Sequence, residues 1–264
     1  MSIKSRSVQC VLAGIVGTAI LGANVRAATV KASVAPRPAE AVFPIVFHTK
    51  DARTGLDIRT TQTKLDEVVV EVKDAGVAIR KRIGGGLSET TLTTKSGSVT
   101  MRLQGGAFTV KTNAGQVAGN LSDPKSLLPV NAALGKSRAA LLAKDLLTRM
   151  TLNPNSVPGH ALLLTRALLQ SVGGDHTGAD SLADWSKKQG GRTTVRRIGL
   201  TDDGPEYCWD TYAIAAIHIW DEYIDCYDNS CSWYNLLCKA GCALIYDLRA
   251  EGAFAWWLHC TAIR

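Results

Sequence analysis

The sequence predicts an α+β fold, in which an N-terminal antiparallel β-meander is followed by helices and then by a small disulfide-stapled helical C-terminal domain. Three observations predict it. Apolar residues recur with a period of two over residues 43–120, and the period becomes helical after residue 124. Six of the seven cysteines lie within the last 57 of the 264 residues. The hydrophobic content of 46% is sufficient for a substantial core.

Residues 1–27 are predicted to be a secretory signal peptide. Lys4 and Arg6 supply a positive start, an apolar run follows over residues 8–25, and Ala27 satisfies the small-residue rule for cleavage. The alternative is an uncleaved membrane anchor, which the glycines and polar residues within the run disfavour. We therefore expect a secreted or periplasmic protein whose mature chain begins with an extended leader at residues 28–42.

Residues 43–120 are predicted to be rich in β-strands. Short runs of β-branched residues alternate with glycine-containing turns, which favours an antiparallel meander, with a small sandwich or a partly closed barrel as its three-dimensional form. The triplet Gly84–Gly86 lacks the spacing and the strand–loop–helix context of a phosphate-binding loop. A wide turn is expected there instead.

Residues 121–200 are predicted to be a helical region that packs on the sheet. Stretches rich in leucine and alanine at residues 126–150 and 158–172 have helical spacing, and a break at residues 153–159 separates them. A shorter helix is expected at residues 179–188.

The histidines of these regions do not predict an active site. His48, His160 and His176 are far apart in sequence, and neither the HExxH nor the GxSxG pattern occurs. His160 is expected at the surface near a helix start. His176 is expected in a glycine-rich loop, where its neighbour Asp175 points in another direction. These observations favour a protein that is not an enzyme and has no cofactor or metal.

Formal charge divides the mature chain into two parts. Residues 28–200 contain 24 lysines and arginines against 13 aspartates and glutamates, a net charge of +11. Residues 201–264 contain 3 against 10, a net charge of −7, together with all six tyrosines. This shift predicts a boundary within residues 192–206 and a separate C-terminal domain at residues 201–264.

Two interpretations of the charge division remain open. The acidic C-terminal part docks on the basic part through complementary fields, or the two are independent modules. The basic part is also suited to an anionic envelope component or a membrane surface, because electrostatic attraction does not select a partner chemically. Nucleic acid is not expected, since no recognised nucleic-acid motif accompanies the charge.

Helices are also predicted in the C-terminal part, over residues 206–226 and 232–252, with a third short helix or an extended end at residues 253–264. Gly241 weakens the second of them. Helices as short as these bury little apolar surface, so the domain is expected to need cross-links.

Three interpretations compete for the cysteines of this part. The spacings Cys226-x4-Cys231 and Cys238-x3-Cys242 approach those of zinc-ligand pairs, but the export signal and two remaining cysteines argue against zinc. The stretch that begins at Cys208 is similar to the nucleophile segment of papain-like proteases, yet it lacks the glycine-rich approach to the cysteine. We therefore expect disulfides among Cys208, Cys226, Cys231, Cys238, Cys242 and Cys260.

Six cysteines allow 15 sets of three disulfides. In a helix of 1.5 Å rise per residue, Cys208 and Cys226 lie at opposite ends and cannot pair. An up-down-up arrangement of three helices favours the pairs Cys226–Cys231, Cys208–Cys242 and Cys238–Cys260.

The layout of the chain suggests a function. A signal peptide, a basic body, a dibasic junction at Arg196-Arg197 and a compact cysteine-rich tail together resemble the organisation of halocin-type bacteriocin precursors. This resemblance implies an antagonistic or interaction module that is released by processing after Ala27 and near Arg197. The alternative is a structural or binding protein of the cell envelope that stays intact, and a third hypothesis is an extracellular hydrolase.

Overall fold

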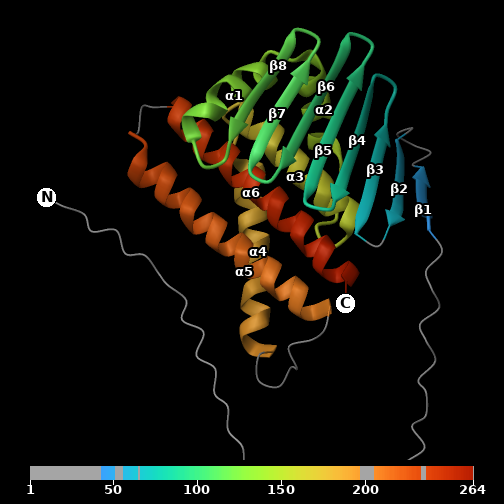
Figure 1. The fold of residues 1–264 in the computed structure, drawn as a ribbon, viewed down its shortest axis with the longest axis vertical. Coiled ribbons are helices and arrows are strands. Elements are labelled where there is room, and N and C mark those ends of the chain that lie inside the picture. The colour runs from blue at the N-terminus through green and yellow to red at the C-terminus, as the bar shows by residue number, and fades with distance from the viewer. Residues whose placement is uncertain (1–42, 51–55, 65, 197–204, 233–235, 264) are drawn as a thin grey trace, which may run out of the picture. The chain divides into compact units, whose positions relative to one another are not determined.

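Eight strands form one antiparallel sheet in which each strand pairs with its neighbours in sequence (Figure 1). The computed structural model describes residues 43–50, 56–64, 66–196, 205–232 and 236–263. The strands are β1 (Ile45–Lys50), β2 (Asp57–Lys64), β3 (Glu67–Lys73), β4 (Val77–Gly84), β5 (Leu87–Thr94), β6 (Gly97–Gln104), β7 (Ala107–Thr112) and β8 (Gly115–Asn120). The predicted meander is confirmed. The sheet is open, with β1 and β8 at its edges, so the expected sandwich or closing barrel is not formed.

The turns of the meander depend on glycine. Gly85 and Gly86 connect β4 to β5 with φ angles of +58° and +74°, and Gly105 and Gly106 connect β6 to β7 with +56° and +81°. Two successive residues at positive φ make the tight hairpin turn that matches the twist of the flanking strands. The expected turn at Gly84–Gly86 is therefore present, but it is a tight turn.

The helices lie against one face of this sheet (Figure 1). They are the short 3-10 turn η1 (Pro124–Leu127), α1 (Leu128–Gly135), α2 (Arg138–Arg149), α3 (Val157–Val172), α4 (Thr177–Arg196), α5 (Pro205–Ile224), the π-helical turn η2 (Asp225–Ser230) and α6 (Leu236–Ile263). Helices α1, α2 and α6 contact the strands directly, whereas α4 and α5 pack behind α3 and α6. Among the described helices, none is long and apolar enough to cross a membrane.

Two serines cap the N-termini of helices α2 and α3 with their side-chain oxygens. Ser137 accepts a hydrogen bond from the backbone N–H of Ala140 at the start of α2, and Ser156 accepts one from Gly159 at the start of α3. Each satisfies one of the backbone donors that a helix leaves free in its first turn. Pro158 lies in the first turn of α3, where its missing N–H has no cost.

Helix α6 is a correction to the sequence-based prediction of two helices. It runs unbroken for 28 residues through Gly241 and Gly252. Each glycine costs about 1 kcal/mol relative to alanine in a helix. Leu244, Leu248 and Phe254 of the same helix are buried in the core, and this burial outweighs that cost. Helix α4 is likewise longer than predicted, since it extends to Arg196.

The main core lies between the sheet and the helices. Alternate residues of the central strands, such as Val70, Ile79 and Leu92, are almost fully buried in it. Tyr212 of α5 and Leu248 of α6 belong to the same cluster. Helices on both sides of residue 200 therefore share one core, and residues 41–264 form a single compact unit.

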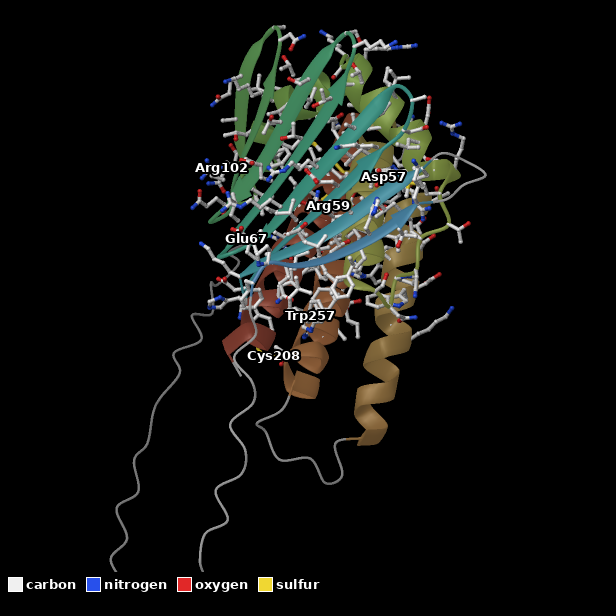
Figure 2. All side chains as sticks on the ribbon, turned by 90° about the vertical axis from the view of Figure 1, so that its right-hand side faces the viewer. Asp57, Arg59, Glu67, Arg102, Cys208 and Trp257 are labelled. Carbon is white, nitrogen blue, oxygen red and sulfur yellow. A yellow bond between two sulfur atoms is a disulfide. The ribbon has the colours of Figure 1, made fainter. Side chains whose placement is uncertain are left out.

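The opposite face of the sheet carries polar and charged side chains. Figure 2 shows Asp57, Arg59, Glu67 and Arg102 on the strands. Arg59 and Arg102 are exposed, and each alternates along its strand with residues that face the core.

Candidate functional site

Helices α5 and α6 form an antiparallel hairpin with disulfides at both ends. Cys208, near the start of α5, is bonded to Cys260 near the end of α6, with 5.7 Å between their Cα atoms. At the turn of the hairpin, Cys226 is bonded to Cys242 (Cα–Cα 5.8 Å) and Cys231 to Cys238 (5.7 Å). Disulfide bonding in this part of the chain is therefore confirmed.

The predicted pairing was wrong for all three bonds, and the continuity of α6 is the reason. The pairs Cys226–Cys231, Cys208–Cys242 and Cys238–Cys260 assumed a chain reversal between the second and third helices. Cys242 and Cys260 instead lie on one helix, about 27 Å apart at 1.5 Å per residue. The start of α5 therefore faces Cys260, and its end faces Cys242.

The two disulfides at the turn lie in contact with each other. The sulfur atoms of Cys231 and Cys242, which belong to different disulfides, are 3.4 Å apart. Those of Cys226, Cys231 and Cys242 all lie within 4.8 Å of one another, a spacing that also suits a metal ion. Because all of them are bonded as disulfides, no thiolate is available here as a metal ligand.

Aromatic rings surround these bonds. Cys231 and Cys242 pack against Tyr223 and Tyr246 in a small buried group that we call the turn cluster. Its other members are Ala179, Ala183 and Ala243. The ring centroids of Tyr223 and Tyr246 are 5.3 Å apart, and Trp220 lies 5.1 Å from Tyr223. Burial raises the pKa of both tyrosines above the ordinary value, so their hydroxyls remain protonated near neutral pH.

A pocket of about 220 Å³ opens against one of the turn disulfides. Cys226 and Cys242 form part of its wall, together with Tyr223 and Tyr246. An ion pair between Arg249 of α6 and the exposed Glu222 of α5 also lines it. The pocket thus brings a disulfide, two protonated hydroxyls and a paired charge to one place.

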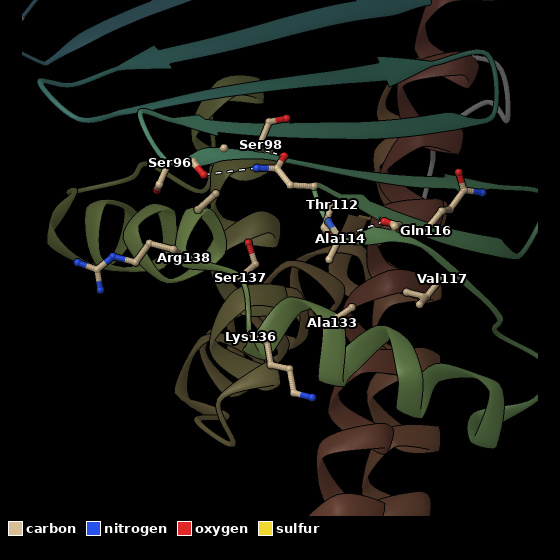
Figure 3. Close-up of a pocket in the computed structure, with 14 residues that line it drawn as sticks. Ser96, Ser98, Thr112, Ala114, Gln116, Val117, Ala133, Lys136, Ser137 and Arg138 are labelled. Carbon is tan, nitrogen blue, oxygen red and sulfur yellow. Dashed lines mark hydrogen bonds between the residues drawn. The ribbon is translucent and has the colours of Figure 1, made fainter.

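A second pocket, of about 370 Å³, lies between two hairpin turns and the junction of α1 and α2 (Figure 3). Hydroxyl and amide groups line it, among them Ser96, Ser98 and Asn113, and the Asn113 amide donates a hydrogen bond to the backbone carbonyl of Ser96. The side chains of Lys136 and Arg138 extend away from these groups (Figure 3). Ala114, Val117, Ala133 and Ala139 contribute apolar surface, so the lining is mixed and indicates no single class of ligand.

A buried polar seam connects α6 to the sheet. The ammonium of Lys81 on β4, which is fully buried, pairs with the carboxylate of Glu251 on α6 and donates a hydrogen bond to Thr165 on α3 at 2.9 Å. Ser88 on β5 donates to the same carboxylate at 3.0 Å. One helical turn earlier, Asp247 accepts a hydrogen bond from Ser171, and burial raises the pKa of Asp247 well above its usual value. None of these groups lines the two pockets.

His160 is buried, which corrects its expected surface position. Only 2% of it is exposed, its Nε2 is hydrogen-bonded to the hydroxyl of Tyr212, and its ring lies 4.7 Å from that of Phe254. Burial lowers the pKa of His160 to about 3, so the ring is neutral at physiological pH. The Nδ1 of His160 lies 3.3 Å from the backbone carbonyl of Pro154, only six positions away. Tyr212 and Phe254 lie more than 50 positions away, so the sequence around His160 carries no signal of those two contacts.

The other predicted residues divide between the described and undescribed parts of the chain. Asp175 accepts hydrogen bonds from Thr177 at the start of α4, while the His176 ring lies 5.4 Å from that of Tyr227. Of the processing residues, Arg196 is the last residue of α4, whereas Ala27 and Arg197 lie outside the described residues.

Comparison of the chain with family models, with curated proteins and with solved structures found no match.

Proposed function

We propose that the mature chain acts intact, outside the cytoplasm, as a non-enzymatic binding protein of the cell envelope. The observation that carries this proposal is the position of α6. Its apolar side chains are part of the main core, and its Glu251 is the buried partner of Lys81. Separating the C-terminal part would expose that apolar surface and leave the Lys81 charge buried without its partner, which is costly.

The released antagonistic module remains the second candidate. One observation favours it, because all three disulfides lie within residues 208–260 and none of them joins the two parts of the chain. A cut at Arg196-Arg197 would leave the C-terminal part covalently complete. It would nevertheless stay bound through the shared core until something displaced it.

Mass analysis of the exported protein distinguishes the two candidates. The binding-protein proposal expects one chain that runs from about residue 28 to residue 264 and is found in the envelope or periplasmic fraction. If a C-terminal fragment beginning near residue 198 is recovered free in the medium, the proposal is wrong and the halocin-like layout is favoured. A fragment that co-elutes with the body on gel filtration would show cleavage without release.

The open face of the sheet is the surface we assign to an anionic envelope partner. Of its carboxylates, Asp57 contacts His48, Glu67 pairs with Arg82, and Glu71 pairs with Arg80. Glu89 of β5 lies opposite Arg102 of β6 in the strand register. The basic side chains outside the three ion pairs include Arg59, Arg102 and Lys111, all of which are exposed. The excess of positive charge on this face is suited to an anionic surface.

Binding to lipid vesicles tests this assignment. The mature protein is expected to sediment with vesicles that contain anionic lipid and not with zwitterionic ones, and added salt should weaken the binding. The double variant Arg59→Glu/Arg102→Glu should bind roughly tenfold more weakly or worse. Lys125→Glu/Arg149→Glu, which changes the same charge on the helical side, is the matched control. Equal loss in both variants would contradict the choice of this face.

A further inference from the structure

The four cysteines at the α5–α6 turn do more than close two loops. Their sulfurs are arranged in the order Cys226–Cys242···Cys231–Cys238, where the central gap between the two bonds is 3.4 Å. We propose that they form a thiol–disulfide relay site, which accepts a small thiol at Cys226 and releases a thiolate at Cys238. This inference goes beyond the proposed binding function and does not depend on it.

Burial separates the entry and exit positions from the interior of the relay. Cys231 and Cys242, the two central residues, are 6% and 3% exposed, whereas Cys226 and Cys238 at the ends are half-buried. Cys226 and Cys242 both line the 220 Å³ pocket, and Cys226 is the more exposed of the two, so a small thiol reaches the Cys226 sulfur first. An external thiol therefore reaches the ends of the array, and the central step takes place between atoms that are already in contact.

The reaction balances as two exchanges. In the first, an external thiolate attacks the Cys226 sulfur, forms a mixed disulfide with it and displaces the Cys242 thiolate. In the second, the Cys242 thiolate attacks the Cys231 sulfur, forms the bond Cys231–Cys242 and displaces the Cys238 thiolate. One S–S bond forms for each one that breaks, and the negative charge passes from the external thiol to Cys238. No oxidant or further reductant is needed.

The surrounding charges favour this direction. Asp225 and Asp228 lie close to Cys226 in sequence on η2, and their carboxylates disfavour a thiolate there. Cys238 is in the first turn of α6, a 28-residue helix, and is followed by Lys239. The N-terminus of a helix stabilises a thiolate, which makes Cys238 the better leaving group. The Lys239 ammonium lies over the ring of Tyr227, 4.1 Å from its centroid.

The chemical class of the first partner follows from the pocket. Its size admits a small thiol such as cysteine or glutathione, and Glu222 already pairs with the Arg249 side chain in its wall. The released Cys238 thiolate would in turn attack a disulfide on another molecule. The site would then couple low-molecular-weight thiols to protein disulfides.

Disulfide mapping after limited exchange tests the relay. The oxidised full-length mature protein is treated with less than one equivalent of glutathione, quenched with acid, alkylated and digested without reduction. The expected product carries glutathione on Cys226, a new Cys231–Cys242 bond and an alkylated Cys238. The bond Cys208–Cys260, whose first cysteine is fully buried, should be unchanged and serves as the internal control.

Two other products would overturn the proposal. Glutathione on Cys226 with an alkylated Cys242 and an intact Cys231–Cys238 bond would show that the central step does not occur. Glutathione on Cys238 with an alkylated Cys226 would show the opposite direction. The double variant Cys231→Ser/Cys238→Ser lacks the acceptor bond, so its Cys242 thiolate can only expel the glutathione again. This variant is expected to lose the stable adduct, and the wild-type map decides the question even if the variant does not fold.

Discussion

The main core and the turn cluster are both buried, but they are built from different materials. The main core joins buried leucine, valine and isoleucine from five of the strands to helices on both sides of residue 200, and none of the three disulfides belongs to it. The turn cluster joins α4, α5 and α6 without a strand, and two disulfides and two tyrosines occupy its centre.

The difference follows from how much apolar surface each location offers. A sheet presents a broad apolar face, and alternate side chains of neighbouring strands fill it. Where only helix ends and a π-helical turn meet, the apolar area is small, and covalent links replace it. The stability of the main core is therefore expected to depend on packing and on the buried Lys81–Glu251 ion pair, and that of the hairpin on its disulfides.

The largest expected effect comes from breaking the ion pair in the main core. Lys81→Met leaves the Glu251 carboxylate buried without its partner, which should lower the free energy of unfolding by about 3–5 kcal/mol. Urea unfolding of the protein measures the change. The double variant Lys81→Met/Glu251→Leu removes both charges and is expected to recover most of the loss. A double variant as unstable as the single one would show that packing, not the unpaired charge, is responsible.

The next largest effect concerns the open end of the hairpin. The Cys208–Cys260 bond closes 52 residues, and the Cys231–Cys238 bond closes 7. On the loop-entropy model, removing the first by paired Cys→Ala substitutions should cost about 4 kcal/mol, and removing the second about 2 kcal/mol. Thermal unfolding of the two variants compares them directly. If removing the Cys231–Cys238 bond costs more than removing the Cys208–Cys260 bond, the Cys231–Cys238 bond stabilises the turn cluster by more than loop closure.

The pH dependence should be smaller and should originate in the main core. The pKa of His160 in the folded protein is about 3, below its unfolded value near 6.5, so folding favours the neutral ring. The contribution of the His160 ring to the free energy of unfolding is fully present above pH 6.5 and is lost as the pH falls toward 3. Between pH 6.5 and 5 the free energy of unfolding should fall by roughly 1.5–2 kcal/mol.

His160→Gln is the variant that isolates this contribution. This substitution should weaken the pH dependence of the free energy of unfolding without abolishing it, because burial also lowers the pKa of His176. Urea unfolding at several pH values measures both proteins. If the free energy of unfolding of the variant falls with pH as steeply as that of the wild type, groups other than His160 take up the proton.

The sequence predicted those features that arise from neighbouring residues. Period-two runs and paired glycines such as Gly105-Gly106 identify the meander, because pairing and turns are local. The cysteines that form disulfides were likewise found from composition. Their partners were not, since pairing depends on whether α6 continues past Gly252. The burial of His160 and of Lys81 depends on α5 and α6, which lie far along the chain, and no local pattern reports it.

The smallest expected effect tests why α6 continues. Gly252 is exposed, and a Cβ atom there would meet nothing within 4 Å. Gly252→Ala should therefore raise the free energy of unfolding by about 0.5–1 kcal/mol through helix propensity alone. Gly84→Ala is the contrasting substitution, because its Cβ would lie 2.1 Å from the carbonyl oxygen of Asp66 at a φ of +151°. Gly84→Ala should lower the free energy of unfolding by more than Gly252→Ala raises it. If Gly252→Ala instead lowered stability, the helix would need that glycine, and burial of its neighbours would not explain why α6 is unbroken.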